Sequence, residues 1–149
     1  MKIALISCTK SKKNYKCEAE ILYSESTLFR KALYYIKENY DKWFILSAKY
    51  GLLKPTSIIE PYDLTLNKFN NEEIKTWAEN VWGSLKKEIN NKDKLYFHCG
   101  ENYRKGLIFY LDKNKIEYEI PLRGISFGKQ LQFYNKKQEK IKKAKGFFD

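Results

Sequence analysis

The sequence is poor in the residues that build disulfide frameworks, metal sites and flexible linkers. Its 149 residues include seven Gly, three Pro, three Cys and one His. An odd number of cysteines without a Cys-x-x-Cys pair fits neither a disulfide framework nor a structural zinc site. The spacing of Cys8, Cys17, His98 and Cys99 does not support a metal site either. We therefore expect reduced thiols, no bound metal and one domain over residues 1–149.

Long apolar runs are also missing. No stretch approaches the roughly 18 consecutive apolar residues of a membrane span. The opening MKIALISCTK has too short an apolar run, and no small-residue cleavage site, for a signal peptide. We expect a cytoplasmic protein that does not enter a membrane. Because 43% of the residues are apolar and 16% are aromatic, wholesale disorder is excluded.

Acidic residues are scarce at both ends of the chain. The net charge is +11, of which residues 1–17 carry +5 and residues 123–149 carry +6, while the residues between them sum to zero. Clustered lysines attract phosphates, so the basic ends suggest anion binding. For the C-terminal run, a solvated lysine-rich helix face is an equally good interpretation.

Apolar runs and helical periodicity alternate along the chain. Continuous apolar runs that stop abruptly are typical of buried parallel strands, and the alternating run near residue 118 indicates an edge strand. We expect a three-layer α/β domain with a mainly parallel sheet of about four to five strands and helices on both faces. The expected strands are 2–8, 43–47, 94–99 and 116–120, the expected helices are 24–40, 70–89, 103–111 and 126–145, and 52–66 is expected to be an ordered loop.

Ligands of such sheets bind outside the carboxyl ends of the strands. After the first strand, Ser7, Lys10 and Lys12 are suited to hold a phosphate or carboxylate. The loop has no glycine and is therefore neither a P-loop nor a dinucleotide fingerprint, so no cofactor is expected. Cys8 is either a nucleophile with a pKa lowered by the neighbouring lysines, or a small buried residue at a strand end.

Polar residues also follow the second strand. Ser47 ends it, and Lys49 is expected to lie close to the sheet, where a desolvated lysine binds anions or titrates unusually. Pro61 stiffens the approach to Tyr62 and Asp63. Asp63 is the best candidate for general acid or base chemistry, and the alternative is a turn or helix cap.

The third and last strands end in glycine turns. Gly100, Tyr103 and Arg104 open a helix whose amino end suits an anionic ligand, and Gly124 opens the last helix in a similar way. Tyr62 or Tyr103 is available to stack on a planar base. The single histidine, His98, is placed to pair only with Cys8 on the neighbouring strand.

At these residues the sequence resembles a family of small, largely uncharacterised bacterial, archaeal and phage proteins. The resemblance covers residues 3–134 and is carried by Ser7-Cys8-x-Lys10, Leu22-Tyr23-Ser24, Ile45-Leu46-Ser47-Ala48-Lys49-x-Gly51-Leu52-Leu53, Pro61-Tyr62-Asp63-x-Thr65-Leu66 and Pro121-Leu122. The Cys8 loop is also faintly similar to one in a domain of archaeosine synthase, although Ser11-Lys12-Lys13-Asn14-Tyr15 lacks the Lys-Pro-Tyr run of that loop. This second resemblance implies a nucleobase, nucleoside or nucleic-acid context.

Three hypotheses follow. The first is an enzyme that acts on a nucleobase, nucleoside or nucleotide, by base transfer, glycosidic cleavage or base modification. The second is a non-catalytic module that binds nucleic acid through its basic termini. The third is a scaffold or partner-binding domain. If Cys8, Lys10, Lys49, Asp63 and Arg104 converge in one concave site, the enzyme is favoured.

Overall fold

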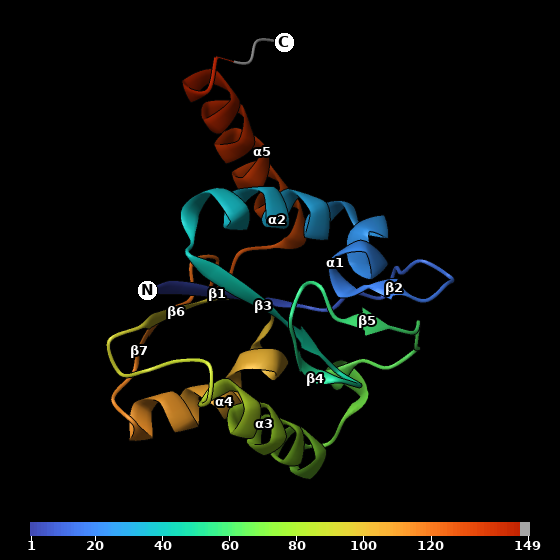
Figure 1. The fold of residues 1–149 in the computed structure, drawn as a ribbon, viewed down its shortest axis with the longest axis vertical. Coiled ribbons are helices and arrows are strands. Elements are labelled where there is room, and N and C mark those ends of the chain that lie inside the picture. Colours follow the sequence, from blue (N-terminus) through green and yellow to red (C-terminus); the bar gives the residue numbers. More distant parts are fainter. Residues whose placement is uncertain (147–149) are drawn as a thin grey trace.

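The computed structural model describes residues 1–146 and forms a five-stranded, mostly parallel sheet between two helical layers (Figure 1). Residues 147–149, which the predicted domain includes, lie outside the described part. The strand order is β4-β3-β1-β6-β7, in which only β4 is antiparallel to its neighbour. The α/β class and the parallel sheet are confirmed. The strands are β1 (Lys2–Ser7), β3 (Lys42–Ser47), β4 (Gly51–Leu53), β6 (Lys94–His98) and β7 (Glu117–Glu119).

Two pairs of helices cover the two faces of this sheet. Helices α2 (Thr27–Asn39) and α5 (Phe127–Ala144) lie on one face, and α3 (Asn71–Leu85) and α4 (Glu101–Lys113) lie on the other (Figure 1). The strand β1 alternates between the two layers. Its residues Ile3 and Leu5 pack under α3 and α4, whereas Ala4 and Ile6 pack under α2. This explains why β1 has no polar residue between its first and last positions, since both faces are buried.

Local sequence accounts for the helix boundaries. In α3, Asn70 and Glu73 form a capping box, in which each side chain accepts a hydrogen bond from the backbone N–H of the other, at 2.8 and 2.9 Å. The helical spacing predicts one apolar face on α3, and all of its residues are buried: Ile74, Trp77, Ala78, Val81 and Leu85. The helix ends at Leu85 and not at Ile89. The remaining helices, α2, α4 and α5, match the predicted segments within three residues at each end.

The spacing of apolar residues predicts a buried stripe of Leu28, Ala32, Tyr35 and Ile36 on α2, of which only Ala32 and Ile36 are buried. Ser26 caps the helix, so α2 begins three residues after Ser24. The buried residues are Phe29, Ala32, Leu33 and Ile36, whereas the predicted Leu28 and Tyr35 are half-buried. Both sets have helical spacing, and the stripes lie side by side on the helix. The helical period fits both sets of residues, and the contact of α2 with the sheet decides which set is buried.

The segment 52–66, predicted as a loop, contains two short strands. Gly51, with a φ of +72°, lets the chain turn back after β3 so that β4 pairs antiparallel with it. Further along, β5 (Ile58–Ile59) pairs with β2 (Cys17–Glu18) to form a separate two-stranded sheet beside the short helix α1 (Ala19–Leu22). Two 3-10 turns complete the order of elements, η1 (Tyr23–Glu25) and η2 (Leu66–Lys68).

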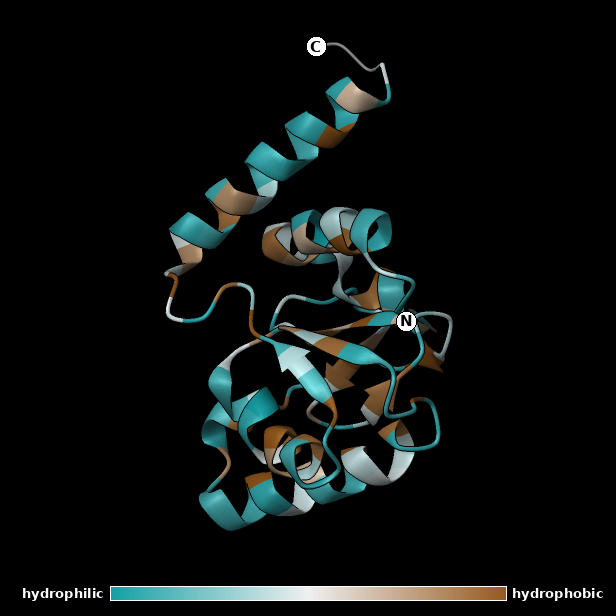
Figure 2. Ribbon diagram, turned by 90° about the vertical axis from the view of Figure 1, so that its left-hand side faces the viewer, coloured by the Kyte–Doolittle hydropathy of each residue, from teal (hydrophilic) through white to brown (hydrophobic). Residues whose placement is uncertain are grey.

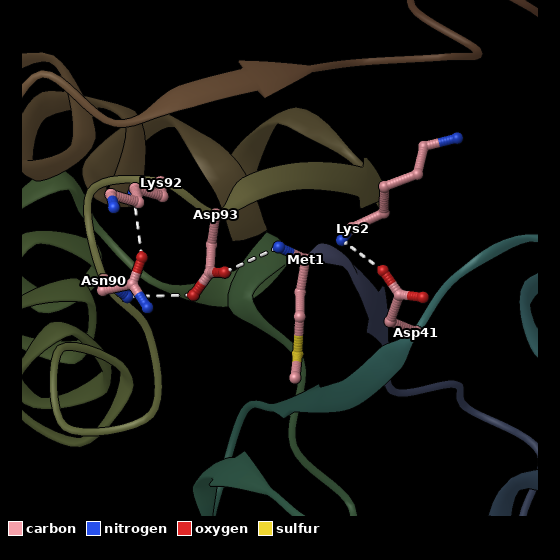
Figure 3. Close-up of polar contacts among 6 residues, drawn as sticks. All are labelled: Met1, Lys2, Asp41, Asn90, Lys92 and Asp93. Carbon is pink, nitrogen blue, oxygen red and sulfur yellow. Dashed lines mark hydrogen bonds and ion pairs between the residues drawn. The ribbon is translucent and has the colours of Figure 1, made fainter.

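Two carboxylates hold the amino end of β1 (Figure 3). The Met1 amino nitrogen donates to Asp93 Oδ1 at 2.9 Å, and Asp41 Oδ2 accepts a hydrogen bond from the Lys2 backbone N–H at 2.7 Å. Asp93 also accepts from the Asn90 backbone N–H, and these hydrogen bonds lower the pKa of its carboxyl. The central strand is thereby tied to the segments that precede β3 and β6.

Helix α5 extends beyond the rest of the molecule. Its first half packs on α2, with Tyr134 buried between the helices and the sheet. Its second half rises away from the sheet toward the C-terminus (Figure 2), and Lys145 at its end pairs with Glu38 of α2. Among the described helices, none combines the length and the apolar character of a membrane-spanning helix.

Candidate functional site

The sheet changes its winding direction at β1. From β1 the chain passes through α2 to β3 on one side, then crosses back through α3 to β6 on the other side. The chain leaves the carboxyl end of β1 toward β3 and leaves the carboxyl end of β6 toward β7, in opposite directions along the sheet. This is the place where open α/β sheets bind their ligands.

A cavity of about 380 Å³ lies at that place. It is within the size range of small-molecule sites. Three chain segments line it, namely the loop after β1, the segment before α3 and the start of α4. The lining residues are Ser7, Cys8, Thr9, Lys10, Lys12, Asp63, Leu64, Thr65, Asn67, Lys68, Gly100 and Tyr103.

Cys8 and Tyr103 form the floor where the three segments meet. The Tyr103 hydroxyl lies 3.5 Å from Cys8 Sγ and accepts a hydrogen bond from the Leu66 backbone N–H at 3.3 Å. Since one lone pair of that hydroxyl is occupied, its proton is available to the sulfur atom. Burial raises the pKa of Tyr103, so the hydroxyl stays protonated. Tyr103 thus joins the start of α4 to the segment before α3 and presents a donor to the cysteine.

Lys12 is the half-buried cation of the cavity. Its Nζ lies 4.5 Å from the centre of the Tyr62 ring and 3.3 Å from the Lys10 carbonyl oxygen, to which it donates. Burial lowers the pKa of Lys12, and the nearby Cys8 and Asp63 partly oppose this shift. Lys12 shares the cavity lining with both Cys8 and Asp63.

Tyr62 does not line the cavity but contacts Lys12, which does. Its hydroxyl lies 2.7 Å from Ser47 Oγ and 2.6 Å from the Tyr23 hydroxyl, and its ring meets Tyr50 and Tyr23 edge-on. Burial raises the pKa of Tyr23 to about 12 and also raises that of Tyr62, so both remain hydroxyl donors. Because one face of the ring carries Lys12, Tyr62 positions that lysine and is not free to stack on a base. Ser47 is buried in this network and, like Tyr62, is absent from the cavity wall.

Lys49 lies outside the cavity. It is exposed, with its Nζ 5.3 Å from the centre of the Tyr50 ring, and it borders a separate groove with Ala48, Phe69 and Trp77. The expectation that Lys49 is desolvated is wrong. The reason is the turn to Gly51, which leaves Lys49 and Tyr50 at its exposed corner while Ala48 stays in the core.

Arg104 and Gly124 line a second cavity, of about 320 Å³. Arg104 donates to the Cys99 carbonyl oxygen at 2.9 Å, across the turn that begins α4. This second cavity lies toward α5, and it shares Ser7 and Gly100 with the first. Two adjoining hollows thus flank the ends of β1 and β6.

His98 is not a base for Cys8. Its two ring nitrogens lie 2.8 Å from the Tyr40 hydroxyl and 2.7 Å from the Tyr134 hydroxyl, so both are engaged on the α2 and α5 side. Burial lowers the pKa of His98 to about 4. The possible Cys8–His98 pair is therefore excluded. On the next residue, burial raises the pKa of the Cys99 thiol to about 12, which makes that cysteine unreactive.

Five residues of the cavity wall were missed by the sequence reasoning. They are Thr9, Leu64, Thr65, Asn67 and Lys68. Thr65 lies within the segment from Pro61 to Leu66 that carries the family resemblance, which was a usable signal. For Asn67 and Lys68 the signal was their position between that segment and the cap of α3. The connection formed by the short turn η2 is only a few residues long, so these two residues must lie close to the segment. Within residues 1–146, no group of three or more His, Cys, Asp or Glu side chains is arranged to hold a metal ion.

The fold and the site define an open, mostly parallel α/β domain with a polar cavity at the carboxyl ends of its two central strands. The chain belongs to a family described as a family of unknown function (DUF6884), which residues 3–136 match. No curated protein and no solved structure matches the chain. The match covers all of the strands except Lys2 of β1, and it includes the first half of α5.

Proposed function

We propose that the protein is a small enzyme that acts on a nucleobase-containing anionic substrate in the cavity between β1, β6 and the segment before α3. The observation that carries this proposal is that Cys8 and Lys12, from the loop after β1, share one concave site with Asp63, which lies far along the chain. Of the five residues whose convergence favours an enzyme, Cys8, Lys10 and Asp63 share the cavity. Lys49 and Arg104 do not.

One side of the cavity suits an anion. Lys10, Lys12 and Lys68 bring three positive charges, and the amino end of α4 begins at Gly100 without a side-chain cap. A phosphate or carboxylate group that binds there also gains from the helix dipole. The Ser7 hydroxyl group also lines the cavity, whereas the Thr9 hydroxyl already donates to the Ser11 carbonyl oxygen at 2.8 Å.

The same cavity also offers hydrogen-bonding groups to a polar heterocycle. Asp63, Thr65 and Asn67 offer a carboxylate, a hydroxyl and an amide, which are the groups that hydrogen-bond the edge of a base. The resemblance of the Cys8 loop to a loop of archaeosine synthase supports a nucleobase. In base transfer or glycosidic cleavage, Asp63 would accept a proton or stabilise positive charge on the ribose carbon, while Lys12 and Lys10 hold the phosphate.

A thermal-shift screen of nucleosides, nucleotides and inorganic phosphate tests this proposal. A ligand at one hundred times its Kd stabilises a protein by about 2.7 kcal/mol, which raises the Tm of a domain of this size by about 5–10 °C. We expect a nucleotide to produce such a shift. In Lys12→Gln and Asp63→Asn, the same nucleotide should bind at least about tenfold more weakly, because each change removes a charged partner.

Lys86→Gln is the matched control. Lys86 is an exposed lysine at the end of α3, away from the cavity, so its neutralisation removes the same charge without touching the site. Its nucleotide affinity should equal that of the parent. If no nucleoside or nucleotide shifts the Tm, or if all three variants bind like the parent, the proposed function is wrong.

A further inference from the structure

Helix α5 carries a stripe of four lysines on the face that points away from the sheet. Lys129, Lys136, Lys140 and Lys143 are spaced by seven, four and three residues, which places them on one side of an α-helix. All four are exposed, and the buried Tyr134 lies on the opposite side of the helix. At a rise of about 1.5 Å per residue, the stripe is about 21 Å long.

The positive charge of this lysine stripe is not balanced by neighbours. Glu139 is the single acidic residue of α5. In the described part of the chain, no ion pair involves any of the four lysines; the neighbouring Lys145, which is not in the stripe, pairs with Glu38 of α2. A long, unbalanced row of ammonium groups attracts a polyanion more strongly than it attracts a single small anion.

The amino end of α5, which carries Lys129, borders the second cavity. Gln130, next to Lys129, lines that cavity together with Gly124, and the cavity adjoins the proposed active site at Ser7 and Gly100. Phe127, at the start of α5, is 62% exposed. Phe127 lies seven residues before Tyr134 and therefore on that side of α5, at the amino end of the helix and not among the lysines. Exposed aromatic rings at the end of a basic track are suited to stack on the bases of a single strand.

We propose that α5 docks a single strand of nucleic acid along its lysine stripe, so that a base of that strand enters the proposed active site. The inference rests on the proposed function, since it identifies the substrate as a base within a strand and not as a free nucleotide. Phe127 stacks on an unpaired base at the entrance, and the phosphates follow the lysines toward the projecting end of α5 (Figure 2). A single strand is required because a paired base cannot reach a cavity at the end of the sheet.

Fluorescence anisotropy with labelled 20-nucleotide strands, oligo-dT and oligo-rU, tests this docking between 50 and 300 mM salt. The stripe variant is Lys129→Gln with Lys136→Gln, Lys140→Gln and Lys143→Gln. The control variant is Lys86→Gln with Lys87→Gln, Lys92→Gln and Lys113→Gln, which removes the same charge from exposed positions near the ends of α3 and α4. Glutamine is a good helix former, so α5 stays helical.

In the stripe variant, we expect the slope of log K against log salt to fall by up to about 3, because each lost phosphate contact contributes about 0.7 for a single strand. The control should change by less than about 1 on the same scale. Phe127→Ala should weaken binding by about fivefold or more, since a base loses its stacking partner. Lys12→Gln should weaken strand binding as well, because the strand reaches the cavity.

Several results would overturn the inference. They are an absence of strand binding by the parent at 50 mM salt, equal losses in the stripe and control variants, and binding that needs the stripe but not Lys12. Phosphatidylserine vesicles that bind through the stripe as tightly as the strands would also overturn it. A nucleotide that binds through Lys12 while strands fail leaves the proposed function standing, whereas failure of the nucleotide screen removes the function itself.

Discussion

Lys12 is the residue whose chemistry depends most on the folded structure. In the sequence it is one of three lysines after the first strand, with nothing to set it apart from Lys10 or Lys13. In the structure Lys13 pairs with Glu25, outside the cavity, whereas Lys12 lies over Tyr62 and faces Cys8 and Asp63. Of these three lysines, Lys13 is already paired with an acidic residue, whereas Lys12 lies in the cavity where a ligand could reach it.

The lowered pKa of Lys12 makes a prediction about pH. An ordinary lysine keeps its charge up to a pKa of 10.5, but burial causes Lys12 to lose its proton at a lower pH. When Lys12 loses its charge, a phosphate-bearing ligand should bind about tenfold more weakly. Because the pKa of Lys12 is lowered, this rise in Kd should occur at a lower pH than it would for an ordinary lysine. Isothermal titration between pH 7 and pH 10 measures it.

Lys12→Arg is the control, because a guanidinium group stays charged over that range. Its Kd should change less with pH than that of the parent. Parallel curves for the two proteins would show that another group controls the affinity.

At the scale of elements, α3 and α4 pack closely at a single glycine. A Cβ atom on Gly106 of α4 would lie 2.4 Å from the Ala78 Cβ of α3. This is far below the contact distance of two carbon atoms, which is about 3.5–4.0 Å. The two helices approach this closely only because neither residue is larger.

Gly106→Ala should therefore destabilise the protein. Overpacking costs about 1–3 kcal/mol, and the gain in helix propensity returns about 1 kcal/mol of it. Since the clash involves two Cβ atoms that cannot rotate away, we expect a net loss of about 1–2 kcal/mol in urea unfolding.

Gly83→Ala is the matched control for this substitution. A Cβ atom there meets nothing within 4 Å, so only the helix propensity changes and the protein should gain about 0.5–1 kcal/mol. A destabilised Gly83→Ala, or a stabilised Gly106→Ala, would contradict this account of the packing.

Elements with a strong local signal were predicted well from the sequence. The cap and apolar face of α3 are examples, because both depend on neighbouring residues of one helix. The hairpin from β3 to β4 was missed, since three residues of β4 carry little periodicity and depend on pairing with β3. The signal that was present is Gly51 between two apolar runs, which is typical of a turn.

At the scale of the whole molecule, His98 joins three elements. It ends β6 and contacts the hydroxyl of Tyr40 after α2 and that of Tyr134 in α5. The rings of Tyr35 and Tyr134 pack around it as well. The attachment of α5 to the sheet therefore surrounds a histidine whose pKa is about 4.

This burial predicts a loss of stability in acid. The unfolded chain binds a proton at His98 near pH 6.5, while the folded protein resists protonation down to about pH 4. Burial of neutral His98 therefore leaves the free energy of unfolding undiminished above pH 6.5, and this free energy decreases as the pH falls from 6.5 toward 4. The cost is about 2 kcal/mol at pH 5, which is a large part of the stability of a small domain.

His98→Gln removes the titration and keeps one donor and one acceptor for the two tyrosines. Between pH 7 and pH 5, urea unfolding of this variant should lose about 2 kcal/mol less than the parent does. Equal losses in the two proteins would show that other groups cause the acid sensitivity.

The sequence by itself determined the order of the longer strands and helices along the chain, the mainly parallel sheet and the end of the sheet at which to look. These follow from apolar runs, caps and helical periods, which are properties of neighbouring residues. Ser7, Cys8, Lys10, Lys12, Asp63, Gly100 and Tyr103 were predicted together and line one cavity.

Only the tertiary structure decided which of the predicted charges share that cavity. The turn to Gly51 carries Lys49 into another groove, and Arg104 faces the adjoining cavity beside α5. Whether the row of lysines on α5 faces solvent depends on which side of α5 packs on α2, and that is the side of Tyr134. Such outcomes depend on contacts between residues far apart in the chain, such as the hydrogen bond from Leu66 to Tyr103, and no local pattern contains them.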